Sequence, residues 1–540
     1  MIITSPYPDV IIPETDITSF VLRRADELGD KPALIDGPSG RTITFGELAK
    51  GTEATAAGLA TRGFGKGDVF AIYCPNVPEY AVAFHAVSRL GGINTTINPL
   101  YTAEELRFQL NDSRARFLLT VPQFLDKAAE AARNSGIEEI FVLGEAAGAT
   151  SFADLMAAGP APEVVIDPQD VVVLPYSSGT TGLPKGVMLT HHNLVANIQQ
   201  CSPALTLDAS DTIIAVLPFF HIYGMQVIMN MAVSFGATVV TMPRFDMEQF
   251  LGLMQDHEVT NAYLVPPIIL GLAKLPVVED YDLSALQLIM SGAAPLGADL
   301  LKACADRLGC TVMQGYGLTE TSPVVSTNRI YDNVPASIGK PIPGVKVKIG
   351  EKDALLVKGP NVMLGYWNKP DATRDIFTED GWLDTGDTAR MDGDGRLYIT
   401  GRLKEIIVLS NGEKVPPVDM ETAIQRDPLF EQVMVMGEHK PYLAVFVVLN
   451  KEQWAKVAAE HGVDAKSTSV LQSDQVEEIV LERVSAQIHE FPGYAQVRRA
   501  AVMPEPWTIE NAMLTPTMKV KRAKVMEAYQ TDYQRIYPGR

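Results

Sequence analysis

Along the first 300 residues, short continuous apolar runs alternate with longer stretches in which apolar positions recur at a helical spacing. Continuous runs are typical of strands buried on both faces of a parallel sheet. Residues 78–90 and the stretch from 44 to beyond 60 have the spacing of helices. The apolar runs lie at residues 69–74, 116–120, 140–143, 171–175, 261–267 and 286–290. The sequence therefore predicts an α/β fold with parallel sheets covered by helices.

The pattern changes near residue 338. Short strands separated by glycine turns follow, most clearly at residues 355–359 and 395–399. A mixed set of elements comes after them, with predicted strands at 406–409, 433–436 and 443–449 and predicted helices at 417–426 and 474–491. We expect a large N-terminal domain over residues 1–401, with a β-rich subdomain at about 338–401, and a small α+β domain over residues 402–540.

Composition narrows the class of protein. A chain of 540 residues with 46% hydrophobic residues is too long to fold around a single hydrophobic core, so two or more domains are expected. Its net charge of −20 argues against a nucleic-acid partner. That charge suits a cytoplasmic protein. Neither a signal peptide nor a transmembrane segment is expected, because the N-terminus lacks a basic region and the apolar stretch 213–242 is interrupted by polar residues. Four cysteines without metal spacing predict buried thiols (Cys74, Cys201, Cys304 and Cys310). No pattern specifies an oligomeric state.

The loop between the predicted strands at 171–175 and 187–190 is dense in hydroxyl groups and glycine. Glycines let a backbone approach an anion, and unpaired backbone N–H groups in such a turn bind phosphate. The loop is not a Walker P-loop, because Pro184 stands where glycine is needed and Gly186 follows Lys185 in place of Ser or Thr. A surface turn is the alternative. The candidate phosphate ligands are Ser177, Ser178, Gly179, Thr180, Thr181, Gly182 and Lys185.

Other candidate groups follow predicted strands, where parallel sheets bind ligands. The small residues Gly292, Ala293 and Ala294 would let a flat ring lie against the backbone, and Tyr316 in the run from Gln314 to Glu320 could stack on adenine. In that run Thr319 could reach a phosphate, and Glu320 could hold Mg²⁺, which prefers carboxylate and phosphate oxygens. Asp387 in a turn suits a ribose diol. On its own, an aspartate in a turn usually only stabilises that turn and binds no ligand. A lone histidine such as His221 usually packs in the core.

Together these motifs resemble the adenylate-forming superfamily, which includes acyl- and aryl-CoA synthetases, firefly luciferases and the adenylation domains of peptide synthetases. The resemblance holds residue for residue over 176–186, recurs at 314–320, and covers essentially the whole chain. Residues 401–405 resemble the hinge of that family, and residues 514–522 resemble its terminal lysine motif. The resemblance implies ATP, CoA as co-substrate, Mg²⁺, a small-molecule carboxylic acid, and a C-terminal domain that rotates between two half-reactions.

The resemblance also implies a role for each matching residue. Lys519, with Lys521 as the alternative, would act in adenylation together with His221, Thr180 and Glu320, and Glu320 would hold the metal. Lys404 would be the hinge. The implied nucleotide contacts are those of the phosphate loop together with Gly292, Ala293, Ala294, Gln314, Gly315, Tyr316, Gly317, Thr319, Asp387, Arg402 and Lys519. The implied acid pocket is His221, Tyr223, Met290 and Gly317, with Tyr263 compatible with it, and the implied CoA contacts are Arg244, Gly412 and Lys414.

The two halves of the chain point to different acids. Residues 217–224, 265–268 and 290–296 resemble 4-coumarate–CoA ligases, whereas residues 408–417 and 517–520 resemble fatty acyl-CoA synthetases. Since the first set contains the predicted acid pocket, we expect an ATP-dependent carboxylic acid–CoA ligase that acts on aryl acids of the 4-coumarate type. The alternatives are a medium- or long-chain fatty acyl-CoA synthetase, an adenylating enzyme that loads a carrier protein in trans, and a luciferase-like oxygenase. A binding protein without catalysis would be expected to lack Lys519 or Glu320.

Overall fold

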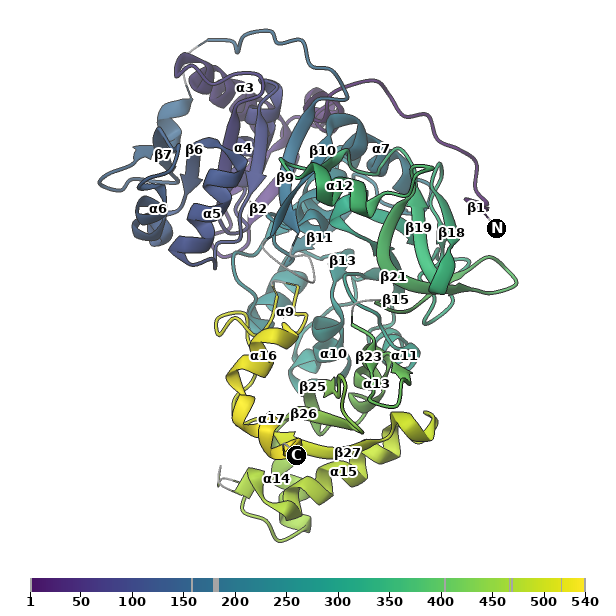
Figure 1. The fold of residues 1–540 in the computed structure, drawn as a ribbon. Helices are drawn as coiled ribbons and strands as arrows, with labels where there is room; N and C mark the ends of the chain where they lie inside the picture. The colour runs from purple at the N-terminus through teal and green to yellow at the C-terminus, as the bar shows by residue number, and fades with distance from the viewer. Residues whose placement is uncertain are drawn as a thin grey trace.

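The computed structural model describes residues 2–156, 159–177, 184–402, 405–465, 467, 470–515 and 517–538. Two mostly parallel sheets form its centre, and a smaller antiparallel sheet lies beside them (Figure 1). The eight-stranded sheet has the order β20 (Gly365–Tyr366), β10 (Lys185–Thr190), β9 (Val171–Ser177), β5 (Ile93–Thr96), β4 (Val69–Tyr73), β6 (Ala115–Thr120), β7 (Glu139–Val142) and β8 (Thr150–Ser151). The nine-stranded sheet has the order β17 (Lys340–Pro341), β16 (Val324–Thr327), β15 (Thr311–Gly317), β14 (Leu288–Ser291), β13 (Asn261–Leu264), β11 (Thr212–Ala215), β12 (Thr238–Thr241), β2 (Pro32–Asp36) and β3 (Thr42–Thr44).

Strand β4 illustrates why the apolar runs form parallel strands. All of its residues are buried, and alternate side chains enter different cores. Phe70 and Ile72 pack into the main core, whereas Ala71 and Tyr73 pack into a second core beneath other helices. A strand covered on both faces cannot alternate apolar and polar residues, which explains the continuous run in the sequence.

Helices cover the two large sheets. They are α1 (Ile17–Val21), α2 (Ala25–Leu28), α3 (Phe45–Thr61), α4 (Glu79–Arg89), α5 (Ala103–Ser113), α6 (Leu125–Ala132), α7 (His191–Cys201), α8 (Ala232–Phe235), α9 (Met247–Asp256), α10 (Pro266–Lys274), α11 (Ala298–Leu308) and α12 (Pro370–Ile376). The third sheet has the order β1 (Ile2–Thr4), β18 (Lys346–Ile349), β19 (Ala354–Lys358), β21 (Leu383–Met391) and β22 (Leu397–Arg402). Most of this sheet comes from the short strands, separated by glycine turns, that were predicted after residue 338.

The C-terminal part has separate apolar cores and lies at one end of the molecule in Figure 1. It contains β23 (Ile407–Val408), β24 (Lys414–Val415), α13 (Pro417–Ile424), β25 (Phe430–Met436), β26 (Leu443–Leu449), α14 (Lys451–Glu460), α15 (Asp474–Gln487), β27 (Val497–Val502), α16 (Arg522–Ala528) and α17 (Gln530–Ile536). The predicted α/β class is therefore confirmed. The domain boundary at residue 401 stays a prediction.

Several helices are shorter than the sequence predicted. The helix predicted for residues 474–491 ends at Gln487, and the helix predicted for residues 417–426 ends at Ile424. The four cysteines are buried and free, as expected. Among the described residues, no helix is both long and apolar enough to cross a bilayer.

Candidate active site

A cavity of about 1870 Å³ lies where the strand ends of the large part face the C-terminal part. Pockets for a single small molecule usually measure about 300–1,000 Å³, so this cavity has room for more than one ligand. Its walls come from the ends of β9, β14, β15, β21 and β22, from α13, and from residues 514–515 and 517–523. The site therefore combines groups from the large part and the C-terminal part of the chain.

The described flanks of the predicted phosphate loop line this cavity. Ser177 ends β9 and Lys185 begins β10, and the two are paired across an antiparallel hairpin. The Ser177 hydroxyl donates to a carboxylate oxygen of Glu320 at 2.9 Å, and the Lys185 ammonium lies 4.7 Å from the centre of the Tyr366 ring. The predicted ligands Ser178, Gly179, Thr180, Thr181 and Gly182 lie outside the described residues.

Glu320 as a residue is 9% exposed and lies in a short 3₁₀ turn after β15. The same oxygen, Oε1, accepts from Ser177 and from the Tyr366 hydroxyl, the latter at 3.0 Å. Burial, and then the charge of Glu320, raise the pKa of the Tyr366 phenol, so that group stays a donor. No cluster of three or more His, Cys, Asp or Glu side chains suited to a metal occurs in the described part of the chain. The single carboxylate of Glu320 is enough for a Mg²⁺ site in which substrate phosphates supply other ligands.

The segment after β14 and the end of β15 form a second wall. A Cβ atom at Gly292 would lie 2.7 Å from the Tyr223 ring, so only glycine allows the backbone to pack flat there. Ala293 has a φ of +68°, an unusual backbone conformation for a residue with a side chain, of the kind that gathers at functional sites. The Gln314 side-chain oxygen accepts from the Leu296 N–H at 2.8 Å, and its buried Nε2 has no hydrogen-bond partner among the described residues. Gly315, Gly317, Ala294 and Thr319 also line the cavity.

A polar group centred on Asp387 forms the next wall. Its carboxylate accepts from the Tyr316 hydroxyl at 2.6 Å and from the Arg402 guanidinium at 2.8 Å, and the residue is 7% exposed. Because a carboxylate has about four acceptor positions, two remain for a ligand. Lys519 lines the same cavity. Reduced hydration, and then the charge of Arg402, lower the pKa of Lys519, whereas Asp387 opposes the shift.

Lys519 lies in the C-terminal part, where backbone groups pair it with Thr515. The Thr515 N–H donates to the Lys519 carbonyl at 2.7 Å, and the Lys519 N–H donates to the Thr515 hydroxyl at 2.9 Å. Leu514 and Val520 form an antiparallel bridge on either side of the turn. Lys521 lines the cavity too, but only Lys519 shifts the pKa of His221.

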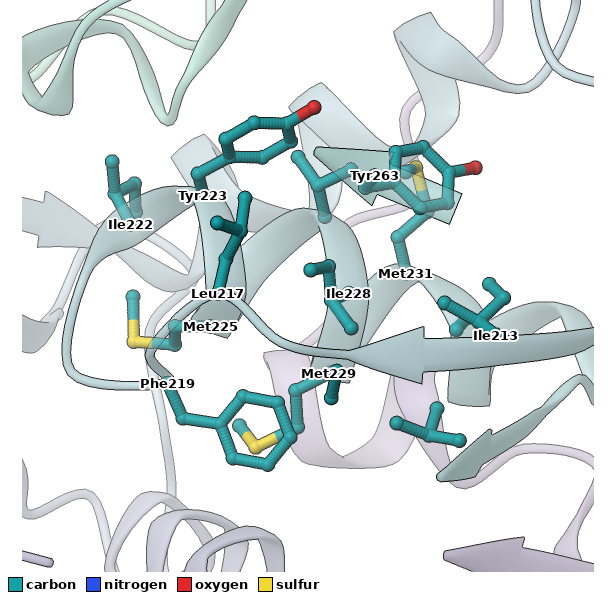
Figure 2. Close-up of a cluster of buried hydrophobic side chains, with 14 of the residues drawn as sticks. Ile213, Leu217, Phe219, Ile222, Tyr223, Met225, Ile228, Met229, Met231 and Tyr263 are labelled. Carbon is teal, nitrogen blue, oxygen red and sulfur yellow. The ribbon is translucent and has the colours of Figure 1, made fainter. Parts of the chain in front are cut away.

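His221 is a neutral donor in this cavity. Its Nδ1 accepts from the Tyr223 N–H at 3.2 Å, which leaves the proton on Nε2. Burial, and then the charge of Lys519, lower the pKa of His221 to about 4. Tyr223 opens a π-helix (Tyr223–Met231), a conformation often found at functional sites. Its hydroxyl donates to the Met290 carbonyl at 3.0 Å, and Figure 2 shows its ring beside the buried apolar cluster.

Some predicted residues do not join the site. Arg244 is largely exposed and pairs with Glu510 at 3.4 Å. Gly412 and Lys414 are exposed at the β23–β24 hairpin, and neither belongs to the cavity wall as far as the chain is described. Lys404 lies outside the described residues. The three predicted CoA contacts therefore remain apart from the cavity in this arrangement.

Two residues that stabilise the site were missed from the sequence. Tyr366 donates to Glu320, and it lies between the predicted strands at 355–359 and 395–399, where no pattern indicated a role. Asp112 accepts from the Tyr176 hydroxyl and from the Lys369 ammonium, both at 2.8 Å, at the outer base of the phosphate loop. Its partners are 64 and 257 positions away along the chain, so no local pattern indicates it.

Comparison with known proteins places these groups in context. Residues 21–367 match the family described as AMP-binding enzyme, and residues 404–540 match the AMP-binding enzyme C-terminal domain. The 4-coumarate–CoA ligase 2 of Petroselinum crispum is 37% identical over 460 residues, which cover 81% of this chain and 84% of that protein.

Solved structures extend the likeness to the whole fold. The ATP-bound MatB from Rhodopseudomonas palustris is 26% identical, with a TM-score of 0.81 over 96% of this chain and 100% of that one. The O-succinylbenzoate Coenzyme A synthetase (MenE) from Bacillus subtilis, in complex with AMP, is 26% identical with a TM-score of 0.75 over 95% and 98%.

Proposed function

This chain belongs to the AMP-binding enzyme family and is an ATP-dependent, AMP-forming acid–CoA ligase, and we propose that it activates aryl acids of the 4-coumarate type. The observation that carries the acid activation is the meeting of His221, Asp387, Arg402 and Lys519 in one cavity. The contact of the Tyr223 ring with Gly292 supports the aryl class. A neutral donor for a carboxylate and cations for phosphate oxygens are what acyl-adenylate formation requires.

We place the nucleotide along the strand ends. The adenine lies between residues 292–294 and the Tyr316 ring, where Gln314 Nε2, which has no partner in the described part of the chain, donates to a ring nitrogen. The ribose hydroxyls donate to the free acceptor positions of Asp387. The phosphates lie at the loop that begins with Ser177 and ends at Lys185, within reach of Thr319. The remaining ligands we assign to this loop are Ser178, Gly179, Thr180, Thr181 and Gly182.

The acid enters beside His221. The Nε2–H of His221 donates to one carboxylate oxygen and leaves the other free to react, because the imidazole stays neutral at neutral pH. The Tyr223 ring in close contact with Gly292 forms one wall of a slot, and Met290 and Gly317 form the others. A slot with a flat aromatic wall suits a conjugated acid.

The free carboxylate oxygen attacks the α-phosphorus of ATP, and pyrophosphate leaves with the electron pair of the broken P–O bond. Charge on the phosphate oxygens grows during this step, so catalysis depends on positioned cations. Lys519 supplies an ammonium group and Arg402 a guanidinium. When bound, Mg²⁺ adds charge neutralisation at the phosphates, and Glu320 is the residue that would hold it.

The second step forms the thioester. The CoA thiolate attacks the acyl carbon, the acyl–phosphate bond breaks, and AMP leaves. We propose that the C-terminal part turns about Lys404 between the steps, withdrawing Lys519 and bringing Gly412 and Lys414 towards the cavity. Arg244 would then exchange Glu510 for a phosphate of CoA. The Arg244–Glu510 pair is exposed, so little energy is lost when it separates.

A second acid class fits one part of the cavity. Its wall includes the apolar residues Leu205, Val227 and Met231, which suit an alkyl chain. CoA-dependent AMP release measured side by side with 4-coumarate and with a medium- or long-chain fatty acid separates the two. A higher kcat/KM for 4-coumarate supports the aryl proposal, and a higher value for the fatty acid contradicts it. A cytoplasmic location stays a prediction from the acidic charge.

A further inference from the structure

The turn that carries Lys519 pairs with itself. The Lys519 N–H and carbonyl both bind Thr515, and the Lys521 N–H donates to the Met513 carbonyl at 2.8 Å. Leu514, at the start of the turn, belongs to an apolar core of the C-terminal part. Apolar contacts have no preferred direction, so this core alone does not fix where Lys519 points.

Arg522 ties the turn to the C-terminal sheet. It follows Lys519 by three positions and begins α16. One of its amino groups donates to the Val435 carbonyl at 2.7 Å, and the other donates to the Glu421 carboxylate. The same carboxylate oxygen accepts from the Val435 N–H at 2.7 Å. One closed set of hydrogen bonds therefore joins α13, β25 and α16.

The position of β25 explains why its backbone takes part. This strand lies at the edge of the three-stranded sheet as described, and an edge strand has backbone groups without a strand partner. At Val435 the side chains of Glu421 and Arg522 bind both of these groups. The two side chains are only 16% and 28% exposed, and hydrogen bonds between charged groups are strong where water is largely excluded.

This ion pair also borders the active site. Glu421, Val435 and Arg522 line the same cavity as Lys519. Both amino groups of Arg522 bind the C-terminal part itself, so its guanidinium is held beside the turn of Lys519. The direction of the Lys519 side chain therefore depends on a pair of residues that are themselves fixed to the sheet.

We propose that Arg522 and Glu421 are positioning residues that direct the Lys519 ammonium into the cavity during adenylation. The inference rests on the adenylation role proposed for Lys519. Since all three residues belong to the C-terminal part, the pair moves with Lys519 when that part turns. It serves the first half-reaction, and its loss spares the second.

The test measures the two half-reactions separately in the full chain. Adenylation is pyrophosphate release with ATP and either 4-coumarate or dodecanoate, and thioester formation is AMP release from the supplied acyl-adenylate and CoA. Arg522→Gln should slow adenylation about 10–100-fold, the cost of a catalytic group displaced by ~1 Å, and keep thioester formation within about twofold of wild type. Glu421→Gln should have a smaller effect of the same kind, because its amide oxygen still accepts from Val435.

Arg499 and Glu477 form the matched control pair. Arg499 donates to Glu477 at 2.6 Å, and Glu477 also accepts from the Ala500 N–H at 2.9 Å. Neither partner belongs to the cavity wall in the described structure. Arg499→Gln and Arg522→Gln should both lower Tm, because each leaves a carboxylate without its positive partner. Only Arg522→Gln should impair adenylation selectively, and equal losses of its two half-reactions would overturn the proposal.

A double variant separates positioning from direct contact with substrate. In a Lys519→Ala background, Arg522→Gln should slow adenylation by no more than about twofold further, because the group that it positions is already gone. A second loss as large as that in the wild-type background would mean that Arg522 acts on the substrate itself, and would overturn the proposal.

His221 supplies a readout that needs no acid. Burial, and then the charge of Lys519, lower the pKa of His221. An NMR titration of His221 should therefore move upwards in Arg522→Gln and stay at the wild-type value in Arg499→Gln. If the wild type adenylates neither acid, the proposed substrates are wrong, and this titration still decides the inference: a shift supports it and an unmoved titration overturns it.

Discussion

Replacing Glu320 by Gln separates the charge of this carboxylate from its shape. The glutamate Oε1 accepts from Ser177 at 2.9 Å and from Tyr366 at 3.0 Å. The amide oxygen of glutamine keeps both acceptor positions. A hydrogen bond to a charged group contributes ~1.5–3 kcal/mol and a neutral one ~0.5–1.5 kcal/mol. Two bonds weakened by ~1–1.5 kcal/mol each should lower the free energy of unfolding by about 2–3 kcal/mol in total.

The effect on catalysis should be larger, because Glu320→Gln removes the negative charge that we assign to Mg²⁺. Losing one preorganised electrostatic group of this kind costs about 10²–10³-fold in rate. The assay is pyrophosphate release over a Mg²⁺ titration at saturating ATP and acid. The variant should show a reduced maximal rate and a half-saturating Mg²⁺ concentration moved upwards.

Tyr366→Phe is the matched control for this experiment. It removes one of the two hydrogen bonds to Glu320 and keeps the carboxylate charge. We expect a loss of stability like that of Glu320→Gln but a Mg²⁺ dependence close to wild type. Should Glu320→Gln titrate with Mg²⁺ as the wild type does, Glu320 does not hold the metal and the assignment is wrong.

Three further predictions concern other parts of the site. Lys519→Ala should lose adenylation, by about 10²-fold or more, yet form thioester from supplied acyl-adenylate; equal loss of both half-reactions would contradict its role. Lys404→Pro should spare adenylation and stop thioester formation, and normal overall turnover would exclude the hinge. Asp112→Asn should raise KM for ATP about 3–10-fold with a smaller change in kcat, because the loss of a charge-assisted bond loosens the base of the phosphate loop; an unchanged KM would refute this.

The sequence predicted those features that depend on neighbouring residues. The apolar runs indicated the strands of both large sheets because each strand is covered on two faces, and the motif at 314–320 indicated Tyr316 and Glu320 because strand ends of a parallel sheet meet at one edge. Element bounds were less accurate, since caps and turns depend on tertiary contacts.

The sequence could not predict how distant side chains pair. Ser177, Glu320 and Tyr366 come from three separate segments, 143 and 46 positions apart, and meet only after the two large sheets and β20 have assembled. Local patterns therefore indicate which residues reach a site, whereas the tertiary structure decides which of them form hydrogen bonds with one another.

The contacts between the two parts of the chain bear on the proposed rotation. Arg244 pairs with Glu510 at 3.4 Å, and Arg426 pairs with Asp299 at 3.2 Å, and all four side chains are at least half exposed. Exposed ion pairs contribute ~0–1 kcal/mol each, so separating them costs little. The C-terminal part keeps its own apolar cores throughout such a movement. The charge of Lys519 lowers the pKa of His221 while both face the cavity, so withdrawal of Lys519 should return the His221 pKa towards its ordinary value. A histidine titration by NMR that shifts upwards in Lys519→Ala would support this coupling, and an unchanged titration would exclude it.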